Sequence, residues 1–203
     1  MIKITDIKEG KRNKNRVNLY TEDGFLMAVY LDTAIAYHIK VGAELSEGEL
    51  ADLRSEDGDK YAAGIAMEFL SYKMRTEREV RKKLKAKEVD GESIDRVVGQ
   101  LAGYGYINDE AYAQAYAQEL MQKYGQRVAV SKMMEKGIDR ALAEKAAQDA
   151  GTSESVLDGY IERLRCKYRG EEPNKAKQKI IRALMGKGFE YEDIKSALAR
   201  TEE

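Results

Sequence analysis

The sequence is poor in residues that bind metals, cross-link chains or break helices. Its 203 residues include one cysteine, Cys166, one histidine, His38, and one proline. A single cysteine cannot form an internal disulfide. Together with one distant histidine, it supplies too few ligands for a zinc, haem or iron–sulfur site. We therefore expect neither a metal nor a cofactor.

Signals for membranes and export are also missing. The longest apolar run, Phe25 to Leu31, is far too short to cross a bilayer. Residues 1–16 lack the apolar core of a signal peptide. The sequence thus predicts a cytoplasmic protein with no membrane partner.

What the sequence does contain is typical of helices with large solvated faces, since 43% of its residues are hydrophobic and 35% are charged. Residues 1–45 differ, because β-branched and aromatic residues partly alternate there and Glu-Asp-Gly at 22–24 signals a hairpin turn with Gly24 at positive φ. A small β-rich module is predicted. Ser46 and Glu49 then form a capping-box pattern that begins the first helix.

Charge is unevenly distributed although the net charge is only -1. Between residues 44 and 59, seven acidic residues accompany one base, Arg54, so this segment should repel nucleic acid. Between residues 73 and 87, eight basic residues accompany two acidic ones, and a second basic region covers residues 163–187. This pattern suits an acidic partner at defined places, while the alternative is that each cluster is an ordinary solvated helix face.

One short ending occurs three times at intervals of about fifty residues: "LKAKEV" at 84–89, "MMEKGI" at 133–138 and "LMGKGF" at 184–189. A glycine at the second-last place suits the left-handed position after a helix, and the next apolar residue folds back onto the last helical turn. Gly137 and Gly188 are therefore predicted helix ends rather than phosphate-binding glycines. Glu88 replaces glycine in the first copy, at a cost on the order of 1 kcal/mol.

The segments around each ending also recur, so the repeating unit is three helices. We predict a mainly α fold in which three tandem three-helix repeats form an elongated, curved array after the β module. The predicted organisation is a β-rich module at 1–45, an acidic helical linker at 46–59, and repeats at 60–107, 108–150 and 151–203.

The segment from Tyr104 to Gln118 joins the first two repeats. Asn108 is placed to cap the following helix, and Tyr112 and Tyr116 share one helical face. These tyrosines could stack on nucleobases, but tyrosines at this spacing beside alanines more often belong to the core between repeats.

These motifs resemble those of the RecX family of regulatory proteins. "RTEREVRKKLKAKEV" at 75–89, "YGYINDEAYAQAYA" at 104–117 and the Lys-Gly-apolar endings are similar to that family's signatures, and the likeness extends to "RVNLYTEDGFLMAVYLD" and "VGAELSEGEL" near the N-terminus. Glu88 and Gln126 depart from the family pattern, which more often has glycine and proline there.

The resemblance implies a non-enzymatic regulator that lies in the groove of the RecA filament on single-stranded DNA and restrains its ATPase and strand exchange. The sequence shows no nucleophile with a plausible base and no glycine-rich phosphate loop, which agrees with a non-enzymatic role. We expect a monomer with RecA as its partner and leave contact with single- or double-stranded DNA open. The candidate RecA- or DNA-binding residues are Arg75, Arg78, Arg81, Lys82, Lys85, Lys175, Lys179 and Arg182.

Two alternatives remain at this point. The protein could bind nucleic acid directly through the basic helix at 76–87, or it could be a helical scaffold for another protein. DNA affinity measured without RecA separates the first alternative, and co-purification from the native host exposes the second.

Overall fold

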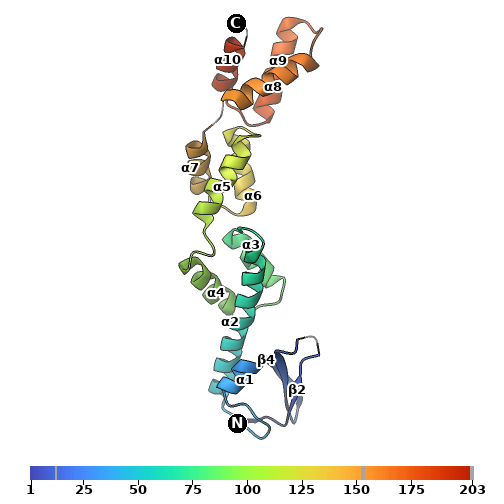
Figure 1. Ribbon diagram of the computed structural model, residues 1–203, viewed down its shortest axis with the longest axis vertical. Coiled ribbons are helices and arrows are strands. Elements are labelled where there is room, and N and C mark those ends of the chain that lie inside the picture. The colour runs from blue at the N-terminus through green and yellow to red at the C-terminus, as the bar shows by residue number, and fades with distance from the viewer. Residues whose placement is uncertain (12, 152–153, 202–203) are drawn as a thin grey trace. The chain divides into compact units, whose positions relative to one another are not determined.

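The computed structural model describes residues 1–11, 13–151 and 154–201, which contain ten helices and five strands. The chain divides into two compact units. The first comprises Met1–Lys73 and Arg81–Tyr104, and the second comprises Met74–Val80 and the residues from Gly105 onward. Figure 1 shows the strands near the N-terminus and helices over the rest of the chain.

The β module is built from two small antiparallel sheets. Strands β2 (Asp6–Glu9), β3 (Arg16–Thr21) and β4 (Gly24–Tyr30) form one sheet in that order, and β1 (Ile2–Lys3) pairs with β5 (Glu44–Leu45). Gly24 closes the β3–β4 hairpin with φ +111°, which confirms the predicted turn. A short helix, α1 (Leu31–Ala36), was not predicted; it follows β4 directly and buries Thr33 and Ala34.

Helix α2 (Glu47–Ser71) begins at the predicted capping box. The Ser46 hydroxyl accepts the backbone N–H of Glu49, and the Glu49 carboxylate accepts the N–H of Ser46. The helix then continues without a break through residues 46–59 and into the first three-helix domain. Leu50 and Leu53 pack in the core of the β module with Leu19, so the acidic segment is part of a packed helix.

Nine of the ten helices in the described ranges form three consecutive three-helix domains, which confirms the predicted mainly α fold. The first contains α2, α3 (Glu77–Lys85) and α4 (Gly91–Gly103). The second contains α5 (Asp109–Met121), α6 (Gln126–Lys136) and α7 (Arg140–Ala150). The third contains α8 (Glu154–Lys167), α9 (Pro173–Gly186) and α10 (Tyr191–Arg200).

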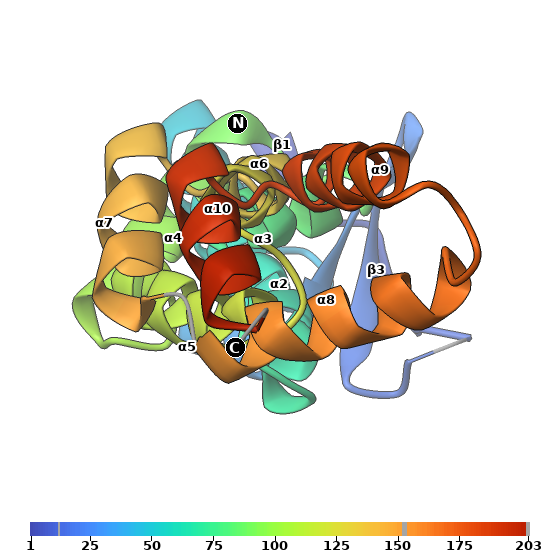
Figure 2. The same ribbon diagram turned by 90° about the horizontal axis from the view of Figure 1, so that it is seen from above.

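The second and third domains each have their own apolar core. Alanines allow close approach of α5 and α7 in the second, where Ala113, Ala117, Ala143 and Ala147 are buried. Tyr112 and Tyr116 pack against this core, so they are not an exposed stacking platform. In the third domain α8, α9 and α10 enclose larger residues that include Ile161, and Figures 1 and 2 show these three helices grouped together.

All three helix endings have the predicted geometry. The residue after the left-handed position donates its N–H back to the last turn, from Val89 to the Leu84 carbonyl, from Ile138 to Met133 and from Phe189 to Leu184, at 3.2–3.3 Å. The left-handed residues are Glu88 (φ +59°), Gly137 (φ +98°) and Gly188 (φ +90°). The first repeat therefore keeps the same backbone conformation despite a side chain that disfavours it.

Glu88→Gly should stabilise the protein by a few tenths to about 1 kcal/mol, because glycine adopts positive φ without the steric penalty of a Cβ atom. Chemical denaturation monitored by circular dichroism measures the change. Glu88→Ala is the control, since it removes the carboxylate but keeps Cβ and should not raise the midpoint. If both variants unfold at the parent's denaturant concentration, the left-handed conformation at this position is not strained.

Candidate interaction surface

The predicted basic face of α3 lies opposite its apolar residues. Val80 and Leu84 are fully buried, whereas Lys82 and Lys85 are exposed. This separation follows from the helical period, because residues four apart share a face. Lys82 and Lys85 form no ion pair with other described residues and present their charges to solvent.

The other candidates on this segment are used differently. Arg81 forms an ion pair of 2.5 Å with Asp95 on α4. Arg75 is half-buried, and Arg78 is exposed although its side chain lies over Gly137. The structure therefore brings Lys82 and Lys85 together as a surface pair and gives Arg78 and Arg81 contacts within the fold.

On α9 three of the candidate residues face solvent together and are here called the α9 ridge. Lys175, Lys179 and Arg182 are exposed, while Ile180 and Leu184 are buried on the other side of the helix. Lys179 also lies 2.6 Å from Glu171 and 5.4 Å from the centre of the Tyr168 ring. Part of the ridge's charge is therefore balanced locally, which leaves Lys175 and Arg182 as its exposed ends.

Two acidic residues of the 44–59 segment have internal partners that the sequence analysis missed. The Asp57 side chain is only 4% exposed, accepts the Tyr30 backbone N–H at 2.6 Å, and pairs with Arg16 at 2.7 Å. The Arg16 guanidinium also lies over the rings of Tyr30 and Tyr61, at 4.6 and 5.1 Å from their centres. The helical spacing was a usable signal, because position 57 continues the apolar face of Leu50 and Leu53.

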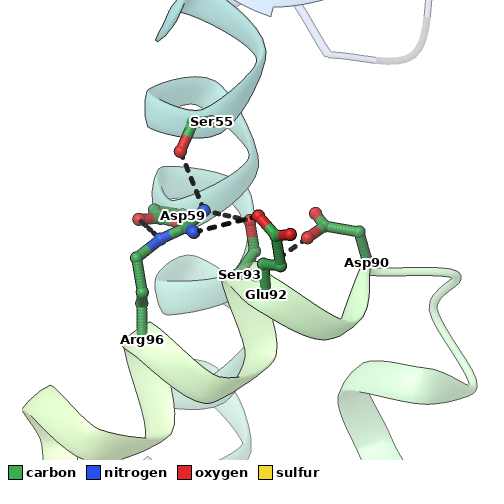
Figure 3. A network of polar contacts seen from close by, with 6 residues as sticks. All are labelled: Ser55, Asp59, Asp90, Glu92, Ser93 and Arg96. Atoms are coloured by element: carbon green, nitrogen blue, oxygen red, sulfur yellow. Dashed lines mark hydrogen bonds and ion pairs between the residues drawn. The ribbon is translucent and has the colours of Figure 1, made fainter. Parts of the chain in front are cut away.

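The second acid, Asp59, takes part in the network that joins α2 to α4 in Figure 3. Arg96 makes two hydrogen bonds to the Asp59 carboxylate, at 2.8 and 2.9 Å, and others to Ser55 and Ser93. Asp90 caps α4 by accepting the Ser93 N–H at 2.8 Å, and this hydrogen bond lowers the pKa of Asp90. Because Asp57 and Asp59 hold the first unit together, the segment's external negative charge is smaller than its composition suggests.

A third acid, Asp109, lies where α5 meets the beginning of α3. Its Oδ1 atom accepts the Glu77 backbone N–H at 2.9 Å. Burial raises the pKa of Asp109, and the neighbouring carboxylates of Glu77 and Glu79 raise it further. Lys136 lies 3.1 Å from Glu79 and balances part of this charge.

Two properties of the described residues bear on the class of the protein. In residues 1–11, 13–151 and 154–201 no helix is long and apolar enough to span a membrane. Within the same ranges, no three His, Cys, Asp or Glu residues gather in an arrangement able to hold a metal ion. Three helical domains with exposed basic residues on repeated helices define a helical-repeat protein with charged surfaces available to a partner.

The particular family follows from comparison with known proteins. Successive RecX domains match this chain in order: the "Regulatory protein RecX N-terminal domain" at residues 2–46 and the first, second and third RecX three-helix domains at 62–101, 108–146 and 159–198. The chain belongs to the RecX family of regulatory proteins.

Individual relatives and solved structures agree. A protein of Clostridium tetani named "Regulatory protein RecX" is 33% identical, over 97% of this chain and 93% of its own length. A Bacillus velezensis protein of the same name is 31% identical, over 98% and 77%. A crystal structure of regulatory protein RecX has a TM-score of 0.73 and 26% sequence identity, over 97% of this chain and 100% of its own. The crystal structure of RecX from Lactobacillus salivarius has a TM-score of 0.68 and 26% identity, over 72% of this chain and 98% of its own.

Asp109→Asn should stabilise the protein at neutral pH. A folded-state pKa raised above the ordinary value of 3.8 means that the folded chain binds this proton more tightly than the unfolded chain, so stability falls as pH rises through that window. Asparagine keeps an oxygen for the Glu77 N–H and removes the charge. The variant's gain over the parent should therefore be larger at pH 7 than at pH 4, measured as denaturation midpoints.

Glu110→Gln is the control for this experiment, because Glu110 is an exposed acid in the same first turn of α5. It should lack the gain at pH 7. A loss of stability at pH 7 in Asp109→Asn would show that the helix terminus needs the negative charge more than it suffers from its burial.

Proposed function

We propose that this protein is a non-enzymatic, cytoplasmic regulator of RecA, which binds as a monomer in the groove of the RecA filament on single-stranded DNA. It inhibits the filament's ATPase, recombinase and coprotease activities in DNA repair. The observation that carries this proposal is the match of nearly the whole chain, including all three three-helix domains, to proteins named "Regulatory protein RecX".

The arrangement of charge supports binding to an extended partner. Basic residues face solvent on the second helix of the first domain, as Lys82 and Lys85, and on the second helix of the third domain, as Lys175 and Arg182. Equivalent helices of a repeat protein present equivalent faces at intervals, and such surfaces suit a partner that itself repeats. Electrostatic complementarity of this kind directs association and selects partners.

Direct binding to nucleic acid is a second candidate, and one observation favours it. Tyr104 and Tyr106, between α4 and α5, are 79% and 56% exposed. Exposed aromatic rings stack on bases of single strands, and basic side chains neutralise phosphates. DNA affinity measured without RecA, as a function of salt, distinguishes this function from one that needs the filament.

The main test adds the purified protein to preformed RecA filaments and measures its retention on the filament together with ATP hydrolysis. Retention with reduced hydrolysis supports the proposal. Unchanged ATP hydrolysis with no retention would rule out the proposed function. Retention only on DNA without RecA would favour direct binding to nucleic acid.

Reversing the α9 ridge with Lys175→Glu, Lys179→Glu and Arg182→Glu should weaken retention and inhibition while thermal stability stays near normal. Exposed charges contribute little to folding, about 0–1 kcal/mol for a surface ion pair such as that of Lys179 with Glu171. On the partner side, however, the variant places like charge against an acidic surface or phosphates. Filament co-sedimentation and ATPase assays measure the effect.

The matched control reverses three exposed lysines of the β module, Lys3, Lys11 and Lys14, with the same change in net charge. It should inhibit RecA like the parent. If the α9 variant also inhibits like the parent, the ridge is only a solvated face, and the binding surface is to be sought at Lys82 and Lys85.

A further inference from the structure

The same helix-to-helix contact occurs twice in the second unit. The end of α6 meets the start of α3, where the Thr76 hydroxyl donates to the Lys136 carbonyl oxygen at 2.8 Å. The end of α9 meets the start of α6, where the Gly125 N–H donates to the Lys187 carbonyl oxygen at 3.0 Å. In both cases the acceptor belongs to the lysine of a Lys-Gly ending.

The donors occupy equivalent positions in their own helices. Thr76 and Gly125 are the residues just before α3 and α6. The closing hydrogen bond of each helix is accepted eight positions later, by the carbonyl of Leu84 in α3 and of Met133 in α6. An arginine lies two positions after Thr76 and two positions after Gly125. Arg127 donates to the Met185 carbonyl oxygen at 2.7 Å, and Arg78 lies over Gly137. The two contacts are therefore copies of one arrangement.

Neither contact leaves room for a side chain on the glycines. A Cβ atom at Gly137 would lie 2.5 Å from the Cβ atom of Arg78, and one at Gly188 would lie 2.6 Å from the Val128 nitrogen. A Cβ atom at Gly125 would overlap the backbone of Gly188 and Phe189. Real Cβ atoms essentially never come this close to other atoms, so either the glycines stay or the helices move apart.

Electrostatics favours the same arrangement. The carbonyl end of one helix carries partial negative charge and the N–H end of the next carries partial positive charge, so the two helix dipoles meet with opposite ends. At the α9–α6 contact the Lys187 ammonium also lies 4.5 Å from the centre of the Tyr160 ring and 5.7 Å from that of Tyr124.

The two ends of the series are finished differently. The ending of α3 carries Glu88, whose side chain is exposed. The start of α9 caps itself, because Pro173 needs no hydrogen-bond acceptor and the Glu172 carboxylate accepts the N–H groups of Asn174 and Lys175. Glycine is thus present at the endings of α6 and α9, which contact the start of another helix. It is absent from the ending of α3, where the side chain of Glu88 is exposed.

We propose that Gly137 with Thr76, and Gly188 with Gly125, form two Lys-Gly joints that set the spacing of successive second helices. On this view Gly125, Gly137 and Gly188 are positioning residues, which hold the helices of the second unit at the intervals that the partner requires. The link to the partner rests on the proposed function, whereas the joints themselves do not.

Gly125→Ala tests the joint most cleanly. Gly125 has φ -76°, a conformation that alanine adopts readily, so a clash with the α9 ending is the reason to expect an effect. Spin labels on the native Cys166 of α8 and on Gln118→Cys of α5, both exposed, report the distance across the joint in the full-length protein. The distance distribution should shift or broaden, and inhibition of RecA should fall.

Gly159→Ala in α8 is the matched control, because a Cβ atom there meets nothing within 4 Å; it should leave both distance and inhibition unchanged. Arg127→Ala, which only removes the hydrogen bond to Met185, is the milder variant should Gly125→Ala fail to fold, and it should broaden the distribution.

If Gly125→Ala has the same distance distribution as the parent, the proposed joint is wrong. If Gly125→Ala does not fold, the same result in Arg127→Ala overturns the joint. A changed distance with parental inhibition would keep the joint but overturn its positioning role. Failure of the parent to bind RecA would overturn the proposed function and leave the distance result standing.

Thermal unfolding of two glycine variants distinguishes the effect of a close neighbour from the effect of a positive φ. Gly137 and Gly170 have nearly the same positive φ, +98° and +96°, but only Gly137 faces a neighbour. Gly137→Ala should therefore lower the thermal midpoint clearly more than Gly170→Ala. Equal losses would mean that φ alone requires glycine at position 137, which would overturn the joint there.

Discussion

The hydrogen bond from Gly125 to the Lys187 carbonyl, and its counterpart from Thr76 to Lys136, join the end of one helix to the start of another. A helix leaves unpaired carbonyls at its end and unpaired N–H groups at its start, and both must find partners when they are buried. The Gly125–Lys187 hydrogen bond serves both needs at once, whereas the Thr76 hydroxyl donates to the Lys136 carbonyl and accepts the N–H of Glu79. The left-handed glycine turns the chain sharply enough for a carbonyl of the ending to face the next helix start.

A different interaction organises the first unit. Arg16 and Asp57 form a nearly buried ion pair that ties the β sheet to α2, and the Tyr30 N–H completes the carboxylate's partners. Removing a charge from water is costly unless it is paired and hydrogen-bonded, and this carboxylate is both. Together with the Arg96–Asp59 pair, it gives two acidic residues of the 44–59 segment internal partners, while the other five are exposed.

These two constructions bear on function in a common way. Small-molecule chemistry needs a concave site with converging polar groups, whereas the exposed candidates Lys82, Lys175 and Arg182 lie on the outer faces of α3 and α9. On the proposed function the protein acts through surface complementarity, and its effect depends on the spacing of the helices within its second unit. Membership of the RecX family and the repeated helix contacts are therefore complementary observations, since one places the chain among regulatory proteins and the other concerns how the helices of the second unit are spaced.

Local features of this protein were predictable because they depend on neighbours within a few residues. The capping box at Ser46, the hairpin at Gly24 and the closing hydrogen bonds to Leu84, Met133 and Leu184 all follow from side-chain type and spacing. The three-helix repeat followed as well, and the helical period also explains why Lys175 and Arg182 are exposed while Ile180 and Leu184 are buried.

Tertiary structure decided which polar and small residues have distant partners. Nothing near Asp57 in the sequence marks Arg16 as its partner, forty-one residues away. Gly125 has an ordinary backbone conformation, so no local rule requires glycine there, and the requirement comes entirely from the backbone of Gly188 and Phe189. The sequence by itself determined the helical periodicity, the caps and the helix endings, because these depend on residues close together in the chain. The tertiary structure decided which residue pairs with a buried charge and where a Cβ atom has space, because folding brings distant segments together.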